Sequence, residues 1–241
     1  MHLAAPAIVL SIRHHGEHGA IVRALTPDDG VRAGYVRGGR SRAIRPILQP
    51  ANAILGDWRA RTADQLAALT VELVHSRAAL HAAPLPAAAL EWLTALTAAA
   101  LPEAQPYPRL YAALAGMLDA VEAAPAARGW AGALARYELL VLAELGFGLD
   151  LTRCVVTGKP DDLAFVSPKS GGAVSRGAAH GYEERLLPLP TFLRDGGEPG
   201  WDDVFAGLAI TGRFLARDVA GLEEALSARG RLLDRLTRAG G

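Results

Sequence analysis

Apolar positions follow two different periods along the chain, and the first of them is typical of strands. Turn-forming stretches separate short apolar runs, among them HHGEHG at 14–19 and TPDDG at 26–30, where Gly30 suits a positive φ. The five strands predicted in this part cover residues 7–12, 20–25, 31–36, 47–58 and 65–74. Five short strands with turns between them indicate a small barrel or sandwich, and five is the strand number of the oligonucleotide/oligosaccharide-binding (OB) barrel.

From about Ser76 the apolar residues recur every three or four positions, which predicts helices. The helices are expected over residues 86–101, 107–122, 127–145, 201–226 and 229–238. Prolines separate the first two, and glycine ends the third in ELGFG. An irregular stretch rich in Gly, Pro, Ser and Asp follows over 151–185. The predicted fold class is therefore α+β, with a strand-rich first part and a helical second part that an insert interrupts.

The composition is that of a globular protein, with 51% apolar and 21% charged residues. No apolar run reaches the roughly 18 residues of a membrane helix, because Pro84, Pro86 and Glu91 interrupt the best candidate. The apolar N-terminal stretch has no Lys or Arg ahead of it and is interpreted as a strand rather than a signal peptide. The single cysteine, Cys154, excludes an internal disulfide framework and favours a reducing cytoplasm.

Positive charge is concentrated in one segment of a chain that has 25 basic and 25 acidic residues. Residues 31–61 hold seven arginines against a single acid, Asp57, whereas acids outnumber bases 24 to 18 elsewhere. The stretch GYVRGGRSRAIRPILQP, residues 34–50, has four arginines and no acid. A basic patch flanked by neutral or acidic surface is typical of a site for an anionic ligand.

Sequence motifs of common enzymes are missing. The chain has no GxxxxGKS/T phosphate loop, no GxSxG elbow, no HExxH helix and no DxDxDG calcium loop. An enzyme is therefore disfavoured, and no cofactor is expected. His14, His15 and His18 could ligate a metal, but no second ligand cluster has zinc-like spacing, and a solvated hairpin turn is favoured. Cys154 could be a nucleophile, yet the role of a small buried apolar residue is favoured.

The arginine-rich segment favours nucleic acid as the anionic ligand, although a solvated basic loop is the alternative. It lies within the strand-rich part, and its glycines let the backbone approach a ligand closely. Tyr35 and Trp58 lie in or beside the strands, and aromatic residues near arginine hold single strands on OB surfaces. Trp58 could equally belong to the core. Several arginine–phosphate contacts predict binding that weakens steeply with salt and has little sequence preference.

The order of these features resembles the bacterial recombination mediator RecO family over the full length. The N-terminal part is similar in HGEHGAIVRALTPDDG, in the basic loop YVRGGRSR and in the following LQP. The middle is similar in ARYELLVLAELGFGLDLTRC, and the C-terminal part in FLARDVAGLEEALSARGRLLDRL. The resemblance implies an N-terminal five-stranded OB-fold barrel over 1–76, a helical domain over 77–150 and 186–241, and a zinc-ribbon-like insert over 151–185.

The resemblance also implies a function without catalysis. A protein of this family binds single- and double-stranded DNA and anneals complementary strands without ATP. With RecR it helps to load RecA onto strands coated with single-stranded-DNA-binding protein (SSB), and it contacts the acidic C-terminal tail of SSB. A cytoplasmic, nucleoid-associated location follows, with no membrane partner. The alternative is a protein-interaction adaptor that binds the SSB tail and contacts DNA only weakly.

Two sets of site residues follow from the resemblance. The expected DNA-binding residues are Arg37, Arg40 and Arg42 in the basic loop, with Arg32 and Arg45 as neighbours. The expected tail-binding residues of the helical domain are Tyr107, Arg109, Leu110, Tyr111 and Arg136. Glu17, in the turn before the loop, is expected to organise the hairpin. An amphipathic helix would also carry the aromatic residues of the second set for core packing.

The insert departs from the family pattern. Many members carry four cysteines there, as two Cys-x-x-Cys pairs that suit tetrahedral zinc. The four positions in this chain are Cys154, Thr157, Ser175 and Ala178, with 17 residues between the two pairs. Serine, threonine and alanine are poor or impossible zinc ligands, so we expect no metal. We expect hydrogen bonds and the packing of Leu163, Phe165 and Val174 to hold the insert instead.

Overall fold

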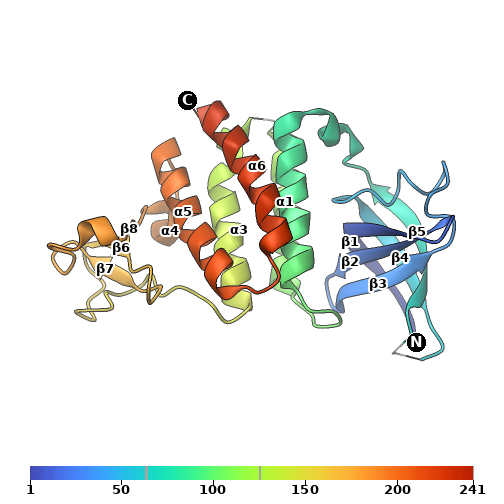
Figure 1. The fold of residues 1–241 in the computed structure, drawn as a ribbon, viewed down its shortest axis with the longest axis horizontal. Helices are drawn as coiled ribbons and strands as arrows, with labels where there is room; N and C mark the ends of the chain where they lie inside the picture. The colour runs from blue at the N-terminus through green and yellow to red at the C-terminus, as the bar shows by residue number, and fades with distance from the viewer. Residues whose placement is uncertain (63–64, 125, 241) are drawn as a thin grey trace.

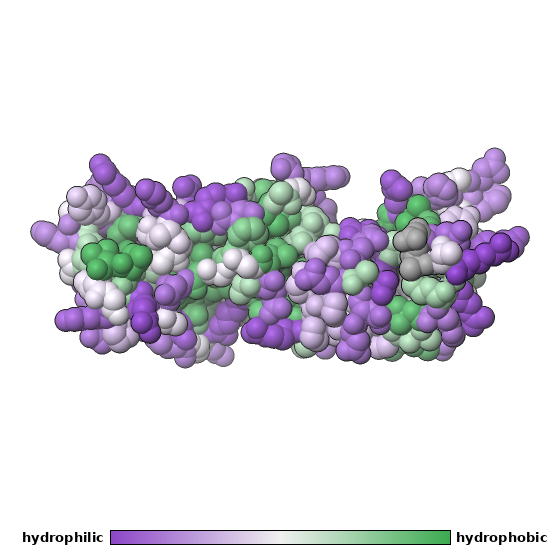
Figure 2. Space-filling view, turned by 90° about the horizontal axis from the view of Figure 1, so that it is seen from below, coloured by the Kyte–Doolittle hydropathy of each residue, from purple (hydrophilic) through white to green (hydrophobic). Residues whose placement is uncertain are grey.

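The computed structural model describes residues 1–62, 65–124 and 126–240 and shows an elongated molecule. A β-barrel lies at one end, the helices lie in the middle, and a small β-sheet formed mainly by the insert lies at the other end (Figure 1). Hydrophilic side chains project at both ends, and the most extensive hydrophobic surface in this view lies over the helices (Figure 2). The predicted α+β fold, with its N-terminal OB-like barrel, is confirmed.

Five strands close the barrel in the order β1-β2-β3-β5-β4. The strands are β1 (His2–His15), β2 (Gly19–Thr26), β3 (Gly30–Val36), β4 (Ala53–Arg59) and β5 (Ala67–His75). The long β1 pairs antiparallel with both β2 and β4, and a short parallel pairing of Gly34 with Ala67 closes the barrel between β3 and β5. Because the barrel closes, each strand has two neighbours, and most of the free strand edge that an open sheet of this size would expose is removed.

The barrel interior is filled by small and branched residues around one indole. Trp58 is fully buried, and β-carbons at Gly34 and Gly56 would lie 2.9 and 2.3 Å from its ring. The two glycines therefore provide the space that the indole occupies. This settles the choice left open for Trp58: it belongs to the core and presents no ring to a ligand.

One predicted strand was too long. The strand expected over 47–58 begins only at Ala53, and the residues before it form turns. Asn52 explains the difference, because its side-chain amide donates to the carbonyl oxygens of Pro46 and Ile47 at 3.0 and 3.1 Å. Ala51 also has a positive φ of 71°, which a strand cannot accommodate.

α-Helices form the middle of the molecule. The α-helices are α1 (Pro84–Ala100), α2 (Pro108–Ala123), α3 (Ala131–Glu144), α4 (Phe192–Asp195), α5 (Trp201–Asp218) and α6 (Glu223–Gly240). A single helix over 201–226 was wrong, since α5 ends at Asp218 and α6 begins at Glu223. Gly221, with a φ of 78°, lies between them and lets the chain reverse (Figure 1). The helices pack around the buried rings of Trp92, Trp130 and Phe214.

The barrel and the helical part are in close contact at Gly30, where there is no room for a side chain. Gly30 begins β3 with a φ of 69°, as expected, and a β-carbon there would lie 1.9 Å from the carbonyl oxygen of Gln105. Beside it, the Ala104 amide donates to the Val31 carbonyl at 3.0 Å. Ile8, Leu10 and Val31 on the outside of the barrel join the apolar core of the helices.

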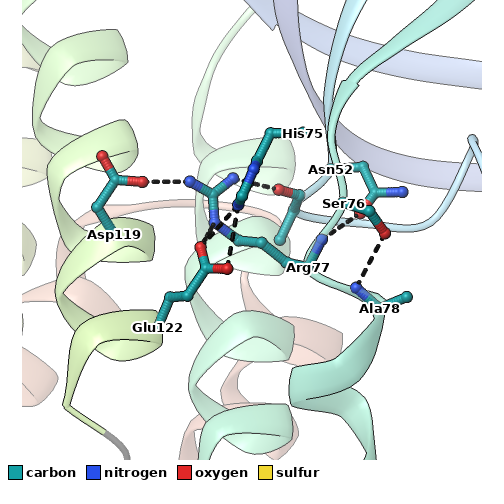
Figure 3. A network of polar contacts seen from close by, with 8 residues as sticks. Asn52, His75, Ser76, Arg77, Ala78, Asp119 and Glu122 are labelled. Carbon is teal, nitrogen blue, oxygen red and sulfur yellow. Dashed lines mark hydrogen bonds and ion pairs between the residues drawn. The ribbon is translucent and has the colours of Figure 1, made fainter.

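Arg77 joins the two parts at a second point (Figure 3). Its side chain is only 6% exposed and donates to the Ala51 carbonyl at 2.9 Å. It also pairs with Asp119 and Glu122 of α2, and its backbone amide donates to the Asn52 side chain at 2.9 Å. A short 3₁₀ helix, η1 (Ala78–Ala82), then leads into α1. The end of β5 is thus fixed to the loop before β4 and to α2 at once.

The insert contributes β6 and β7 to a three-stranded sheet in the order β7-β6-β8, and β8 lies just beyond the expected boundary at 185. The strands of this sheet are β6 (Leu163–Val166), β7 (Ala173–Ser175) and β8 (Leu187–Pro188). Leu163 and Val174 are buried, and half-buried Phe165 packs against the same core. This core continues into the helices, so the domain boundaries drawn at 76, 150 and 185 remain a prediction.

Candidate nucleic-acid interface

The loop between β3 and β4 presents four of the five expected arginines to solvent. Arg37, Arg40, Arg42 and Arg45 are all exposed. The loop is built from turns, since the Ser41 amide donates to the Gly38 carbonyl at 2.8 Å and the Arg45 amide to the Ser41 carbonyl at 3.0 Å. Gly39 lets it pack closely on β2, where a β-carbon would lie 2.7 Å from that of Ala20. A backbone held in place by hydrogen bonds thus carries exposed cationic side chains.

Arg40 ties this loop to the β1–β2 turn. Its backbone amide donates to the His18 carbonyl at 3.3 Å, and its guanidinium donates to the Glu17 carbonyl at 3.2 Å. Glu17 therefore contributes its backbone to the hairpin, and its carboxylate is 94% exposed, 3.8 Å from His18. Because the Glu17 side chain makes no contact with the loop in these bonds, its expected role in organising the hairpin stays a prediction. The turn histidines and the loop arginines lie at the same end of the barrel.

Arg32 lies elsewhere. It stands near the β2–β3 turn, where its guanidinium is 3.4 Å from the Asp29 carboxylate and its side chain is 24% exposed. The loop leaves β3 at the opposite end of the strand, after Val36. The structure therefore brings together Arg37, Arg40, Arg42 and Arg45 but not Arg32. Arg32 is only five residues from Arg37 in the sequence, but the extended strand β3 between them places the two side chains at opposite ends of the barrel.

The sequence reasoning missed Arg13. This exposed residue lies near the end of β1, opposite Ile21, and Ile21 pairs in turn with Tyr35 of β3. Arg13 thus belongs to the same end of the barrel as the loop, which we call the basic end: Arg13, His14, His15, His18, Arg37, Arg40, Arg42 and Arg45. Tyr35 is half-buried there, and its ring meets that of His15 edge-on with 6.0 Å between centroids. The cue in the sequence was Arg13 directly before two histidines.

The second expected set does not form one site. Tyr107 and Leu110 are buried in the core of the helices, and burial raises the pKa of Tyr107. Arg109 points outward and pairs with Glu144 at 2.8 Å, while Tyr111 is half-buried. Arg136 lines a cavity. Tyr107, just before α2, and Tyr111 within it both pack against the core of the helices.

Arg136 lies in a cavity of about 610 Å³ between α3, α4 and the start of the insert. Its guanidinium donates to the Gly197 carbonyl at 2.8 Å and lies 5.3 Å from the centre of the Phe192 ring. Arg194 adds a second cation. The apolar walls come from Leu139, Leu140, Leu149, Leu151 and Leu193. Asp195 also lines the cavity, with its carboxylate 3.8 Å from the Arg194 guanidinium. We call this the Arg136 pocket; it combines an apolar floor with two cations and one acid.

The zinc positions of the insert do not suit the metal. Cys154 is buried, and its sulfur accepts hydrogen bonds from the amide and hydroxyl of Ser175 at 3.3 and 3.4 Å. Burial opposes the thiolate, but donors on Ser175 and Thr157 outweigh it and lower the pKa of Cys154 to about 6. At the Ser175 position a hydroxyl that donates to this sulfur thus replaces a second thiolate ligand. Within residues 1–62, 65–124 and 126–240, no three His, Cys, Asp or Glu side chains gather as ligands.

Comparisons with known proteins agree on one family. The family described as "Recombination protein O N terminal" matches residues 1–77, and "Recombination protein O C terminal" matches residues 84–221. A DNA repair protein RecO of Cereibacter sphaeroides is 47% identical over 234 residues, which cover 96% of each chain. A DNA repair protein RecO of Jannaschia sp. is 44% identical over 97% of this chain and 96% of the relative. The protein of the same name in Rhodospirillum centenum is also 44% identical, over 97% of this chain and 94% of the relative. In the part of the chain that is described, no helix is both long and apolar enough to cross a membrane. The chain belongs to the RecO family of DNA repair proteins.

Proposed function

We propose that this protein is a recombination mediator that binds single- and double-stranded DNA through the basic end and anneals complementary strands. The supporting observation is the group of exposed arginines on the β3–β4 loop, with Arg13 beside them and Glu17 as the nearby acid. Cations of this kind attract phosphates without regard to sequence, which suits a protein that must act on any broken DNA. No catalytic step is part of the proposal.

The Arg136 pocket supports a second element of the proposal, the binding of an acidic and apolar protein tail. Two guanidinium groups, on Arg136 and Arg194, can pair with carboxylates, and the leucine walls can bury an apolar side chain. We assign the acidic C-terminal tail of SSB to this pocket. In this scheme RecR joins the complex and RecA is loaded on the strand from which SSB is displaced, in the cytoplasm at the nucleoid.

DNA binding by the basic end is tested with a variant that replaces Arg37, Arg40 and Arg42 by alanine. We expect single-stranded DNA affinity to fall and the slope of log affinity against log salt to become shallower by about 2, since each phosphate contact contributes roughly 0.7. The matched control replaces Arg153, Arg176 and Arg185 of the insert, which removes the same charge far from the barrel (Figure 1). Equal behaviour of the two variants would refute the assigned surface.

The adaptor function is the second candidate, and the Arg136 pocket is the observation that favours it. In that case a peptide copying the SSB tail would bind tightly, while bare DNA would bind weakly to the unaltered protein. Annealing of SSB-coated complementary strands separates the two candidates. A mediator anneals them in a manner that depends on both the loop arginines and the SSB tail, whereas an adaptor requires only the tail.

A further inference from the structure

A groove runs from the basic end of the barrel onto the helices. It consists of two adjoining cavities of about 480 and 650 Å³, which share Ile12, Pro50 and His81. The first opens beside Arg45 and His14 of the basic end, and the second ends at Arg231 and Arg235 of α6. We call the two together the inter-domain groove. Its lining thus comes from β1, the β3–β4 loop, η1, α1 and α6.

Among the residues that the structure describes, the groove carries an unpaired cation at each end. Arg45 is exposed and Arg235 is half-buried, and neither takes part in an ion pair between described residues. Glu91 is the acid that lines the groove, and Arg231 pairs with it at 2.5 Å. After this pairing, two guanidinium groups at opposite ends still lack an anion.

The walls between these cations are apolar or carry flat rings. Leu10, Ile12 and Ala87 supply apolar surface, and His14 and His81 supply imidazoles. Single strands bind in grooves where cations follow the backbone and flat or apolar side chains contact the bases. A groove with cations at both ends and such walls between them has these features.

We propose that the inter-domain groove continues the DNA-binding surface and holds a single strand that leaves the β3–β4 loop towards α6. The inference rests on the proposed function, because it assumes that the loop arginines hold DNA. Continuity supports a strand as the occupant, since Arg45 belongs both to the loop and to the groove. The strand's phosphates meet Arg45 first and Arg235 last.

The first test replaces Arg235 by glutamine and measures binding of a short oligonucleotide, about 6 nucleotides, and a long one, about 30, by fluorescence anisotropy. The short strand fits within the span of one OB barrel, so its affinity stays unchanged. For the long strand we expect affinity to fall about two- to fivefold and the salt slope to become shallower by about 0.7. Arg238→Gln is the matched control, because Arg238 is an exposed cation of the same helix that does not line the groove.

The second test uses a variant that is expected to raise the affinity for the long strand. Glu91→Gln removes the acid that lines the groove and releases Arg231, so affinity for the long strand rises and the salt slope becomes steeper. Thermal unfolding of both variants checks that they fold. The inference is overturned if Arg235→Gln and Arg238→Gln behave alike, or if Glu91→Gln leaves long-strand binding unchanged.

Failure of the inference and failure of the proposed function give different results. If the loop variant loses DNA binding and Arg235→Gln does not, only the groove assignment is wrong. If the loop variant retains DNA binding, the proposed function itself is wrong. If Arg235→Gln weakens a peptide copying an acidic protein tail and leaves DNA binding unchanged, the groove holds a peptide and the inference is again overturned.

Discussion

Glu138 of α3 and Arg229 of α6 form an ion pair inside the helical part of the molecule. The Nε and Nη2 atoms of Arg229 donate to the two Glu138 carboxylate oxygens at 2.9 and 2.8 Å. The Arg229 side chain is 9% exposed and the Glu138 side chain 0%. Trp92 of α1 donates to the same carboxylate at 2.8 Å, and Thr211 of α5 donates to its other oxygen. One carboxylate therefore connects the four helices α1, α3, α5 and α6.

Glu138→Gln is expected to lower the free energy of unfolding by about 3–5 kcal/mol, because it leaves the Arg229 guanidinium buried without its counter-charge. Chemical denaturation measures the change. Arg109→Gln breaks the exposed pair with Glu144 and serves as the control, with an expected loss below about 1 kcal/mol. Similar losses for the two variants would mean that the buried pair contributes no more than a surface one.

Arg77→Ala is expected to destabilise the junction between barrel and helices by about 2 kcal/mol, since the Ala51 carbonyl loses a buried donor and the Glu122 carboxylate loses an ion-pair partner. Asp119→Asn tests the exposed branch of the same network, where the carboxylate is 69% exposed, and should cost below about 1 kcal/mol. Hydrogen exchange of the amides in β5 and η1 would report loosening at the junction. Unchanged exchange in Arg77→Ala would contradict the role assigned to this residue.

Stability is expected to depend on pH through Cys154. Its pKa is lowered from 9.0 to about 6 in the folded chain, so the folded state binds the proton more weakly than the unfolded state. The stabilisation that the Cys154 thiolate contributes to the folded state is then fully present above about pH 9 and is lost as the pH falls through about 6. The difference in unfolding free energy between the unaltered protein and Cys154→Ala should therefore grow from pH 6 to pH 9. A difference that does not change with pH would show that the thiol stays protonated.

Elemental analysis of the purified protein is expected to find no stoichiometric zinc. The donors on Ser175 occupy the sulfur of Cys154, and Thr157 and Ala178 supply no thiolate. Addition of a chelator should accordingly leave the thermal midpoint unchanged, whereas a structural zinc would make it fall. One zinc ion per chain would disprove this account of the insert.

Replacement of Arg136 by alanine is expected to weaken the binding of a peptide copying the SSB tail at least tenfold, about 1.4 kcal/mol. Arg109→Ala should leave the affinity unchanged, because Arg109 lies outside the Arg136 pocket and pairs with Glu144. Isothermal titration with the two variants distinguishes these outcomes. Should Arg109→Ala cause the larger loss, the tail would bind on α2 rather than in the pocket.

Local patterns predicted most elements, and tertiary pairing decided where several of them end. β1 was expected over 7–12 but spans His2–His15, because it pairs with β2 at one end and β4 at the other. The leucine period ran through the break between α5 and α6, although Gly221 was visible in the sequence. The length of β1 could not follow from its own residues, since partner strands supply its hydrogen bonds.

The candidate sites were predicted unevenly for a similar reason. The loop arginines follow one another within a few residues, so local sequence was sufficient to group them. The Arg136 pocket joins α3 to α4 and to the start of the insert, and local sequence gave no reason to group its leucines, which come from three separate segments. The inter-domain groove joins β1 to α6, and no local pattern could place Arg235 beside a barrel.

The barrel and the insert lie at opposite ends of the molecule, with the helices packed side by side between them (Figure 1). Neighbouring helices stay about 8–10 Å apart because their side chains interdigitate and resist compression. Under the proposed assignments, the helical part is then a rigid spacer between the DNA at the basic end and the protein tail in the Arg136 pocket. Each ligand can arrive or leave without displacing the other, so one copy of the chain can keep hold of a coated filament while the bare strand changes partners.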